Sequence, residues 1–169
     1  MMTRRYTRRR VTTASLATIL ATVTMPRISA QAADPAKKFE IIKTVDEWRK
    51  VLPKEVFYVM REHGTERPFS SPLDKIVAAG VYNCAACDLA LFNADTKYDS
   101  GTGWPSFWKP LDNAVGESKD NTMFYTRTEI HCRRCGGHLG HSFPDGPKPT
   151  GLRYCMDGVA MKFVPKASS

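Results

Sequence analysis

The chain has 169 residues, of which 42% are hydrophobic and 25% are charged, and its formal net charge is +8. Residues 1–32 contain six arginines and no acid, so the remaining 169 − 32 = 137 residues carry only 8 − 6 = +2. Nucleic-acid binding needs a basic face on the folded domain, which a basic leader does not provide, so no nucleic-acid partner is expected. A stretch of this length forms one domain of ordinary size.

Residues 1–32 resemble a signal peptide. Arginines come first, residues 11–25 are uncharged, and Ala30-Gln31-Ala32 resembles a signal-peptidase site. The arginine run at residues 7–11 is typical of the twin-arginine route, which is an address and not an anchor. We therefore expect export to a bacterial periplasm, with residues 33–38 as a tether; a mitochondrial transit peptide is the alternative. The apolar run is too short for a membrane span, so no stable membrane insertion is expected.

Two short helices are predicted at the start of the domain, which we place at residues 39–169. Thr44 and Glu47 form a capping-box pattern before the apolar positions of a first helix. A second helix is predicted over residues 54–63, with Gly64 as its C-cap. Both helices are expected to pack on the outside of a sheet as scaffold.

From Arg67 onward, proline and glycine divide the chain into short segments. The candidate strands are Gly80–Asn83, Leu89–Asn93, Met123–His131, Gly151–Met156 and Val159–Phe163. Short strands between turn residues favour antiparallel pairing over alternating βαβ units. The predicted fold class is therefore mainly β, as antiparallel sheets or a small barrel, with short N-terminal helices.

Four of the five cysteines lie in two Cys-x-x-Cys pairs, Cys84 with Cys87 and Cys132 with Cys135. Two such pairs supply the four corners of a tetrahedral metal site. Two disulfides are the alternative in an exported protein, but a disulfide within Cys-x-x-Cys is typically redox-active. Thiolate ligands favour zinc over iron here. We expect one structural zinc, held by knuckles that join different strands and brace a single domain.

Cys155 is the thiol left without a structural partner. If Tyr154 lies in a strand, Arg153, Cys155 and Asp157 share one face, which places the thiol between a cation and an acid. The thiolate is the reactive form of cysteine and nearby charge sets its pKa, so Cys155 is a candidate nucleophile. A buried cysteine acting as a small hydrophobe is the alternative.

Two glycine-rich segments accompany the candidate nucleophile. The loop Asp99–Phe107 presents two aromatic residues, Trp104 and Phe107. Such residues are more often core, but the glycines beside Trp104 indicate an exposed loop, so we interpret them as an aromatic wall of a pocket. The segment Gly136–Phe143 carries His138 and His141, which we interpret as proton donors. By their spacing these histidines could also be metal ligands, and either one could be a structural histidine.

Four ordered motifs of this chain resemble those of a known family. They are Gly80-Val-Tyr-Asn-Cys-x-x-Cys87, Asp99-Ser-Gly-Thr-Gly-Trp-Pro-Ser-Phe107, Cys132-x-x-Cys-x-x-His-Leu-Gly-His141 and Gly151-Leu-Arg-Tyr-Cys155. Through them the chain is similar to the methionine sulfoxide reductases of type B. The resemblance implies a β-sheet fold, a structural zinc, and reduction of the R epimer of methionine sulfoxide in proteins, with Cys155 as nucleophile. It also implies that the substrate is surrounded by Trp104, His138, His141, Phe143, Asp145 and Arg153.

The chemistry of a sulfoxide gives these residues their expected roles. The sulfur is electrophilic only if the oxygen is protonated as the S–O bond breaks, so the site needs a thiolate and an acid. Arg153 favours the thiolate. His141 or His138 supplies the proton, and Asp145 can orient a histidine. Trp104 offers a polarizable face to the methyl group, and the reaction leaves methionine and a cysteine sulfenic acid.

Two positions depart from the family pattern. Many members carry, at the position of Thr102, a second cysteine that attacks the sulfenic acid. Because the other cysteines are assigned to zinc, we expect an outside thiol, thioredoxin-like or small, to reduce Cys155 directly. Asp157 stands where the family usually has Asn. An ionised Asp157 should raise the pKa of Cys155 unless it pairs with Arg153 or a histidine.

Two other functions remain open at this point. A non-catalytic zinc-ribbon-like binding module would have no need for Cys155. A zinc hydrolase using His138 and His141 would need an open coordination position on its metal. Our expectation is an enzyme that acts as a monomer on oxidised proteins.

Overall fold

The computed structural model of the chain describes residues 39–167. The predicted signal peptide (residues 1–32) and tether (residues 33–38) lie outside the described residues. Within the described part of the chain, none of the helices has the length and apolar character that crossing a membrane requires.

Helix α1 (Val45–Val51) begins at Thr44, as the capping-box pattern predicts. The Thr44 hydroxyl accepts a hydrogen bond from the Glu47 N–H at 3.3 Å, and the Glu47 carboxylate accepts one from the Thr44 N–H at 2.7 Å. Helix α2 (Lys54–Glu62) follows and buries one face against the sheets. Its buried residues are Phe57, Val59 and Met60.

Helix α2 ends at His63, so the prediction of Gly64 as its C-cap is wrong by one residue. His63 takes a left-handed conformation with φ of 54°, and the Gly64 N–H then donates to the Tyr58 carbonyl at 3.0 Å. A left-handed conformation costs a non-glycine residue about 1 kcal/mol or more. The His63 ring gains an ion pair with Glu129 at 3.2 Å in return, which explains why a histidine stands at this turn.

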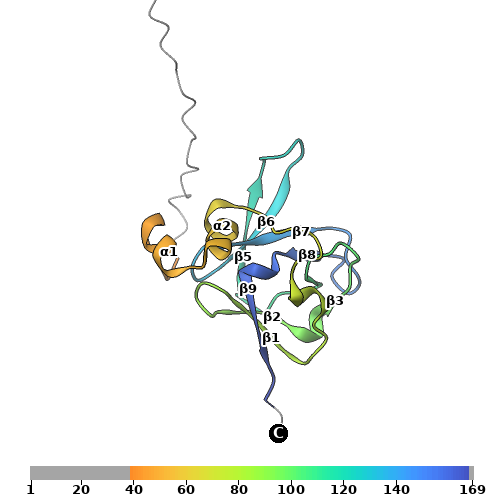
Figure 1. Cartoon of the computed structure of the whole chain (residues 1–169). Coiled ribbons are helices and arrows are strands. Elements are labelled where there is room, and N and C mark those ends of the chain that lie inside the picture. The colour runs from red at the N-terminus through yellow and green to blue at the C-terminus, as the bar shows by residue number, and fades with distance from the viewer. Residues whose placement is uncertain (1–38, 168–169) are drawn as a thin grey trace, which may run out of the picture. The chain divides into compact units, whose positions relative to one another are not determined.

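The strands of the described residues form two antiparallel sheets (Figure 1). The smaller sheet has the order β2-β1-β9 and contains β1 (Gly80–Cys84), β2 (Ala90–Asn93) and β9 (Met161–Pro165). The larger sheet has the order β3-β4-β8-β7-β6-β5 and contains β3 (Lys97–Tyr98), β4 (Ser106–Phe107), β5 (Val115–Asp120), β6 (Arg127–Cys132), β7 (His138–Phe143) and β8 (Arg153–Met156). The predicted class, mainly antiparallel β with N-terminal helices, is confirmed.

All five predicted strands are present, with shifted ends. The largest shift is in β6, which begins at Arg127 rather than at Met123, and β9 begins at Met161 because Gly158–Ala160 forms a short 3-10 helix, η3. The strands that the pattern does not predict are β3, β4, β5 and β7. The first two have only two residues each, and β5 and β7 carry polar residues or glycine where a half-buried strand would show alternating apolar residues.

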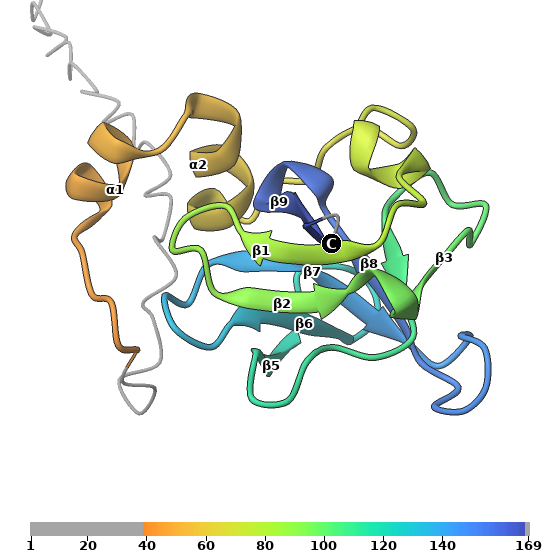
Figure 2. The same cartoon turned by 90° about the horizontal axis from the view of Figure 1, so that it is seen from below.

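Aromatic side chains between the two sheets form the centre of the core. Phe92 of β2 stacks on Phe107 of β4 with ring centroids 4.3 Å apart, and Tyr82 of β1 meets the same Phe107 ring edge-on at 4.9 Å. Tyr154 of β8 approaches Phe92 at 6.1 Å. Figure 2 shows β1 and β2 lying across the larger sheet in the arrangement that these contacts require. The core therefore holds β4 and β8, and the residues they carry, in fixed positions.

Strand β7 contains a bulge that decides where its histidines point. The pairing of β6 with β7 shifts between Ile130 and His131, so that Leu139 is the additional residue on β7. Gly140 beside it has φ of 146°, and a Cβ at this position would collide with the Cys155 carbonyl. Because the bulge moves the alternation by one residue, His138 and His141 lie on the same face, with ring centroids 5.2 Å apart.

Candidate active site and metal centre

The four predicted metal-binding cysteines converge at one point. Their sulfur atoms all lie within 4.8 Å of one another, with Cys84 to Cys135 at 3.8 Å and Cys87 to Cys132 at 3.5 Å. A tetrahedral zinc site with Zn–S bonds of about 2.3 Å separates its sulfurs by about 3.8 Å, whereas a disulfide needs about 2.05 Å. The four thiolates therefore form a structural zinc site, and the alternative of two disulfides is excluded.

The two knuckles are built in the same way. Each begins at the last residue of a strand, Cys84 of β1 or Cys132 of β6, and closes with a hydrogen bond to that residue's carbonyl from the residue after the second cysteine. Those closing residues, Asp88 and Gly136, both have left-handed backbones, with φ of 57° and 66°. As predicted, each knuckle is a turn between strands, so the zinc joins the smaller sheet to the larger one.

Around Cys155, pairing across the larger sheet aligns one row of polar residues. The row runs through Tyr98, Ser106, Cys155, His141, Glu129 and Ser118, one residue from each strand in spatial order. Directly paired residues of neighbouring strands point to the same face of a sheet. Cys155 therefore stands between a serine and a histidine, with a carboxylate one strand further on.

Cys155 is partly exposed, which argues against the alternative of a sealed structural cysteine. Burial is the main influence on the thiol and raises the pKa of Cys155; a contact of 3.9 Å from the Thr102 hydroxyl and the charge of Arg153 act in the opposite direction. The hydroxyls of Ser100 and Ser106 continue this polar wall, with Ser100 located 2.8 Å from Thr102 and 2.7 Å from Ser106. The thiol is thus contacted by one hydroxyl, that of Thr102, which is linked to the hydroxyls of Ser100 and Ser106.

Each active-site histidine has its own carboxylate partner. His141 Nε2 lies 2.8 Å from Asp120 Oδ2, which also accepts from Arg127 at 2.6 Å. Burial raises the Asp120 pKa, but hydrogen bonds from Thr122, His141 and Arg127 outweigh it and hold that pKa below its usual range. Burial also lowers the pKa of His141, although Asp120 opposes the effect. Asp120 therefore fixes the orientation of the His141 ring on the strand next to Cys155.

His138 is buried and is oriented by Glu129. Its Nδ1 lies 2.8 Å from Glu129 Oε1, and the same carboxylate accepts from Ser118 at 2.5 Å and pairs with His63 at 3.2 Å. Burial raises the Glu129 pKa, but these hydrogen bonds outweigh it and lower that pKa. With Nδ1 occupied, the Nε2 atom of His138 is buried and has no partner among the described residues.

Asp145 does not orient a histidine, so this expectation is wrong. Its two carboxylate oxygens accept from Arg153 Nε at 2.9 Å and Nη2 at 2.8 Å, and this hydrogen bonding lowers the pKa of Asp145. Arg153 also stacks on the Phe143 ring, 4.5 Å from its centroid. The carboxylates that serve the histidines come instead from β5 and β6, which are the next strands across the sheet.

Asp157 also departs from the expected arrangement. It follows the last residue of β8, is only 3% exposed, and accepts a hydrogen bond from the Glu66 N–H at 2.9 Å. No pairing with Arg153 or with a histidine is found for it in the described part of the chain, which excludes the two partners that we expected. Burial raises the pKa of Asp157 to about 7.

Trp104 is half-buried, and its indole donates to the Glu66 carbonyl at 3.2 Å. The glycine before it is needed for the turn, because Gly103 has φ of 86° and a Cβ there would meet Phe69. Pro105 accepts from the Met156 N–H at 3.0 Å, so the loop runs directly beside the strand of Cys155. Trp104 therefore lies on the loop next to the strand of Cys155. Phe107, at the end of the same predicted loop, is fully buried in the core, so the interpretation as a pocket wall is wrong for Phe107.

Sequence reasoning missed the residues that support the site. They are His63, Glu66, Asp120 and Glu129, none of which belongs to a recognised motif. Of these four, only Glu129 could have been identified from the sequence. It lies in a predicted strand, Met123–His131, where side chains alternate between faces, so it shares a face with His131. The others are placed by sheet register and by the loop after α2, which a single sequence does not reveal.

The metal site of the rival hydrolase is not assembled. Within residues 39–167, groups of three or more converging metal ligands are the four cysteines and the set His63, Glu129 and His138. His141 belongs to neither group. A metal held jointly by His138 and His141 is therefore not supported.

Comparison with known proteins agrees with this geometry. The SelR domain model matches residues 52–165. Curated proteins named peptide methionine sulfoxide reductase MsrB are similar to the chain: that of Agrobacterium fabrum is 53% identical over 127 residues, covering 75% of this chain and 94% of the relative. The chain belongs to the MsrB family. The protein of Pseudomonas syringae is 52% identical over 74% of this chain and 96% of the relative, and that of Leptospira interrogans is 49% identical over the same shares.

One solved structure, the Mis18 Yippee-like domain, is similar with a TM-score of 0.42 and 13% identity, covering 53% of this chain and 99% of that chain. A likeness of this size carries no argument about an MsrB protein. The MsrB relatives match almost from end to end, so the family assignment applies to the whole described domain.

Proposed function

We propose that this protein reduces methionine-R-sulfoxide residues of oxidised proteins to methionine, with a thiol as the electron donor, and so repairs them. The observation that carries the proposal is the row in which Cys155 stands between Ser106 and His141, with Trp104 beside it, in a chain about half identical to MsrB enzymes. The zinc is structural and takes no part in the reaction.

The chain's own residues account for the steps. The Cys155 thiolate attacks the sulfoxide sulfur while the oxygen is protonated, which forms an S–S bond between Cys155 and the substrate. The hydroxyl then passes from the substrate sulfur to the Cys155 sulfur as the S–S bond breaks, so that methionine leaves with the electron pair and Cys155 becomes a sulfenic acid. His141 supplies the proton, because it is paired directly with Cys155 on the neighbouring strand and the Asp120 carboxylate favours its protonated form. Arg153, held by Asp145, stabilises the thiolate before attack.

Regeneration of Cys155 is proposed to follow a one-cysteine cycle. The nearest side chain at the position of the family's second cysteine is Thr102, which cannot form a disulfide. The other four cysteines hold the zinc. Cys132, on β6, lies two strands away from Cys155 on β8 and three residues further along its strand, which separates the two residues by on the order of 10 Å or more. An external thiol, thioredoxin-like or small, therefore attacks the sulfenic acid, which forms a mixed disulfide with Cys155 and releases water; a second thiol then attacks that disulfide and releases the Cys155 thiol and an oxidised donor disulfide.

The decisive experiment is turnover of the two methionine sulfoxide epimers separately, with dithiothreitol as donor. We expect the R epimer in a peptide to be reduced and the S epimer to be left unchanged. Equal turnover of both epimers, or of neither, would sink the proposal.

We also propose that the protein is exported through the twin-arginine route to a bacterial periplasm, where it acts as a monomer. The order of arginines, uncharged stretch and small residues in residues 1–32 supports this. Recovery of the protein from a periplasmic fraction with a new N-terminus near residue 33 is expected. Recovery of full-length protein from cytosol would contradict export, and a dimeric mass in light scattering would contradict the monomer.

A further inference from the structure

The segment that leaves helix α2, residues 64–71, runs between the Trp104 loop and the end of β8. On one side, the Phe69 N–H donates to the Gly103 carbonyl at 2.6 Å. On the other side, a Cβ on Gly158 would collide with Ser71, so the segment also packs on the short helix η3 that follows Asp157. This segment therefore contacts both the Trp104 loop and the short helix that follows the strand of Cys155.

Glu66 is the residue of this segment whose backbone links Trp104 to Asp157. Its N–H donates to Asp157 Oδ1 at 2.9 Å, and its carbonyl accepts from the Trp104 indole at 3.2 Å. Asp157 is buried and Trp104 is half-buried. A shift of the Glu66 backbone would break or strain both contacts together.

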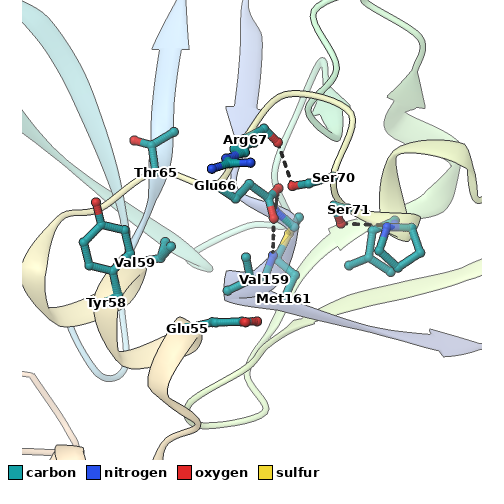
Figure 3. Close-up of a pocket in the computed structure, with 13 residues that line it drawn as sticks. Glu55, Tyr58, Val59, Thr65, Glu66, Arg67, Ser70, Ser71, Val159 and Met161 are labelled. Atoms are coloured by element: carbon teal, nitrogen blue, oxygen red, sulfur yellow. Dashed lines mark hydrogen bonds between the residues drawn. The ribbon is translucent and has the colours of Figure 1, made fainter.

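The Glu66 side chain fixes that backbone in place. Its carboxylate accepts from the Gly158 N–H at 2.5 Å and from the Val159 N–H at 3.2 Å. Figure 3 shows it pointing to the backbone of Val159 at the edge of a cavity of about 600 Å³ that Glu55 also lines. Hydrogen bonds from two amides to one carboxylate are stronger than neutral ones, so this anchor is rigid.

We propose that Glu66 is a positioning residue of the reductase, which acts by holding the Trp104 indole in place beside the strand of Cys155. The inference rests on the proposed function. Glu66 does not touch the reacting atoms; it holds the indole on which the substrate methyl group packs. Its effect should therefore appear in substrate binding more than in the chemical step.

The test is Glu66→Gln, assayed with a peptide containing methionine-R-sulfoxide. The Gln side chain keeps the shape, but its NH₂ group faces one of the two amide donors, so the anchor loses one bond and gains a repulsion. We expect KM to rise about tenfold with kcat changed less than about threefold, the pattern of lost ground-state binding. An unchanged KM would overturn the proposal.

A matched control is Glu55→Gln. It makes the same change of charge on the same cavity wall, at an exposed residue for which no hydrogen bond is found in the described part of the chain. Its KM should equal that of the wild type. If both variants raise KM equally, the cause is the charge of the cavity and the positioning role is refuted.

A double-variant cycle distinguishes positioning from loss of stability. Trp104→Phe keeps an aromatic ring but has no indole N–H for the Glu66 carbonyl. If Glu66 acts through Trp104, Glu66→Gln should change KM less than about twofold in this background. An equal tenfold effect in both backgrounds would mean a general structural role and overturn the proposal.

Two further outcomes have separate meanings. If the wild type does not reduce the R epimer, the proposed function itself has failed, whatever the variants do. If Glu66→Gln loses its zinc or its cooperative melting, the cycle is repeated with Glu66→Asp, which keeps the charge but is too short to reach both amides. A wild-type KM for a folded Glu66→Asp variant would then overturn the positioning role.

Discussion

The two sites of the molecule use the same functional group in opposite surroundings. At the knuckles, four thiols converge, with Cys84 to Cys135 at 3.8 Å and Cys87 to Cys132 at 3.5 Å; three of them are buried, Cys87 is partly exposed, and their geometry fits one metal ion. At the catalytic site, a single thiol is partly exposed among hydroxyls, a guanidinium and an imidazole. The comparison teaches that neighbours, and not the cysteine itself, decide whether a sulfur is structural or reactive.

The two sites are nevertheless built on shared strands. Cys132 ends β6, and β7 begins three residues after Cys135 and pairs with Cys155 at His141. Arg61 of helix α2 donates to the Cys135 carbonyl at 2.9 Å and lies over the Trp48 ring at 3.8 Å, so the helices are also tied to the knuckle. Separating the roles of the two kinds of cysteine therefore requires variants that affect one site only.

The largest effect is expected from Cys155→Ser, which should lower turnover of the R epimer by at least about a thousandfold. A serine hydroxyl cannot take the oxygen as a sulfenic acid. One zinc per chain and the wild-type melting temperature should remain, as elemental analysis and calorimetry can show. Turnover above a tenth of the wild-type rate would remove Cys155 from its role.

The converse variant, Cys135→Ser, should release the zinc and lower the melting temperature by at least about 10 °C, because metal binding contributes to folding. Activity would fall only as the folded fraction falls. Cys155→Ser is the matched control, since it removes a thiol without touching the metal. A Cys135→Ser protein that melts like the wild type would show that the zinc is not structural.

A moderate effect is expected for Asp157→Asn, which should move the rising limb of the pH–rate profile to lower pH by less than about one pH unit. Burial is the main cause that raises the pKa of Cys155, and the charge of Asp157 adds to it. The pKa of Asp157 is itself raised to about 7, so its carboxylate is charged above that pH and neutral below it.

The difference in rate between Asp157→Asn and the wild type should depend on pH. Above about pH 7 the variant lacks a negative charge that opposes thiolate formation, so it should be the faster enzyme; below that pH the two should agree. Values of kcat/KM measured from about pH 6 to about pH 9 would check this. Superimposable profiles would mean that Asp157 acts only as the acceptor for the Glu66 N–H.

The smallest effect on rate, but a change of product, is expected for Thr102→Cys. The Thr102 hydroxyl lies 3.9 Å from the Cys155 sulfur, so a thiol there is close enough to attack a sulfenic acid after a small movement of the loop. Mass spectrometry of the oxidised variant should show a disulfide where the wild type shows a sulfenic acid. A wild-type disulfide through Cys155 would contradict the one-cysteine cycle.

The sequence was sufficient for the two kinds of cysteine because their chemistry is local. A Cys-x-x-Cys pair contains its own turn, and two pairs imply a metal without knowledge of the fold. The helix at Thr44 was predictable for the same reason, since a capping box lies within four residues. The resemblance of the motifs to those of the type B reductases also implied that Trp104, His141 and Cys155 lie in one site.

What the sequence could not show are the partners that arise only from pairing between strands. Asp120 and Glu129 reach the histidines because β5 and β6 are the next strands across the sheet, whereas Asp145, which is nearer in sequence, is taken by Arg153. Asp157 was expected on the face of Cys155 but follows the end of β8. Such errors come from extending one strand's alternation beyond its end.

The bulge at Leu139 and Gly140 has a consequence for natural variation and for protein engineering. The extra residue reverses the alternation of side chains along β7, so His138 and His141, which are three positions apart, face the same reaction centre. Removing a single residue there would turn His138 to the opposite side while leaving every catalytic side chain in the sequence. A homologue that lacks one residue at this point would therefore keep both histidines in its sequence without presenting them to the same reaction centre.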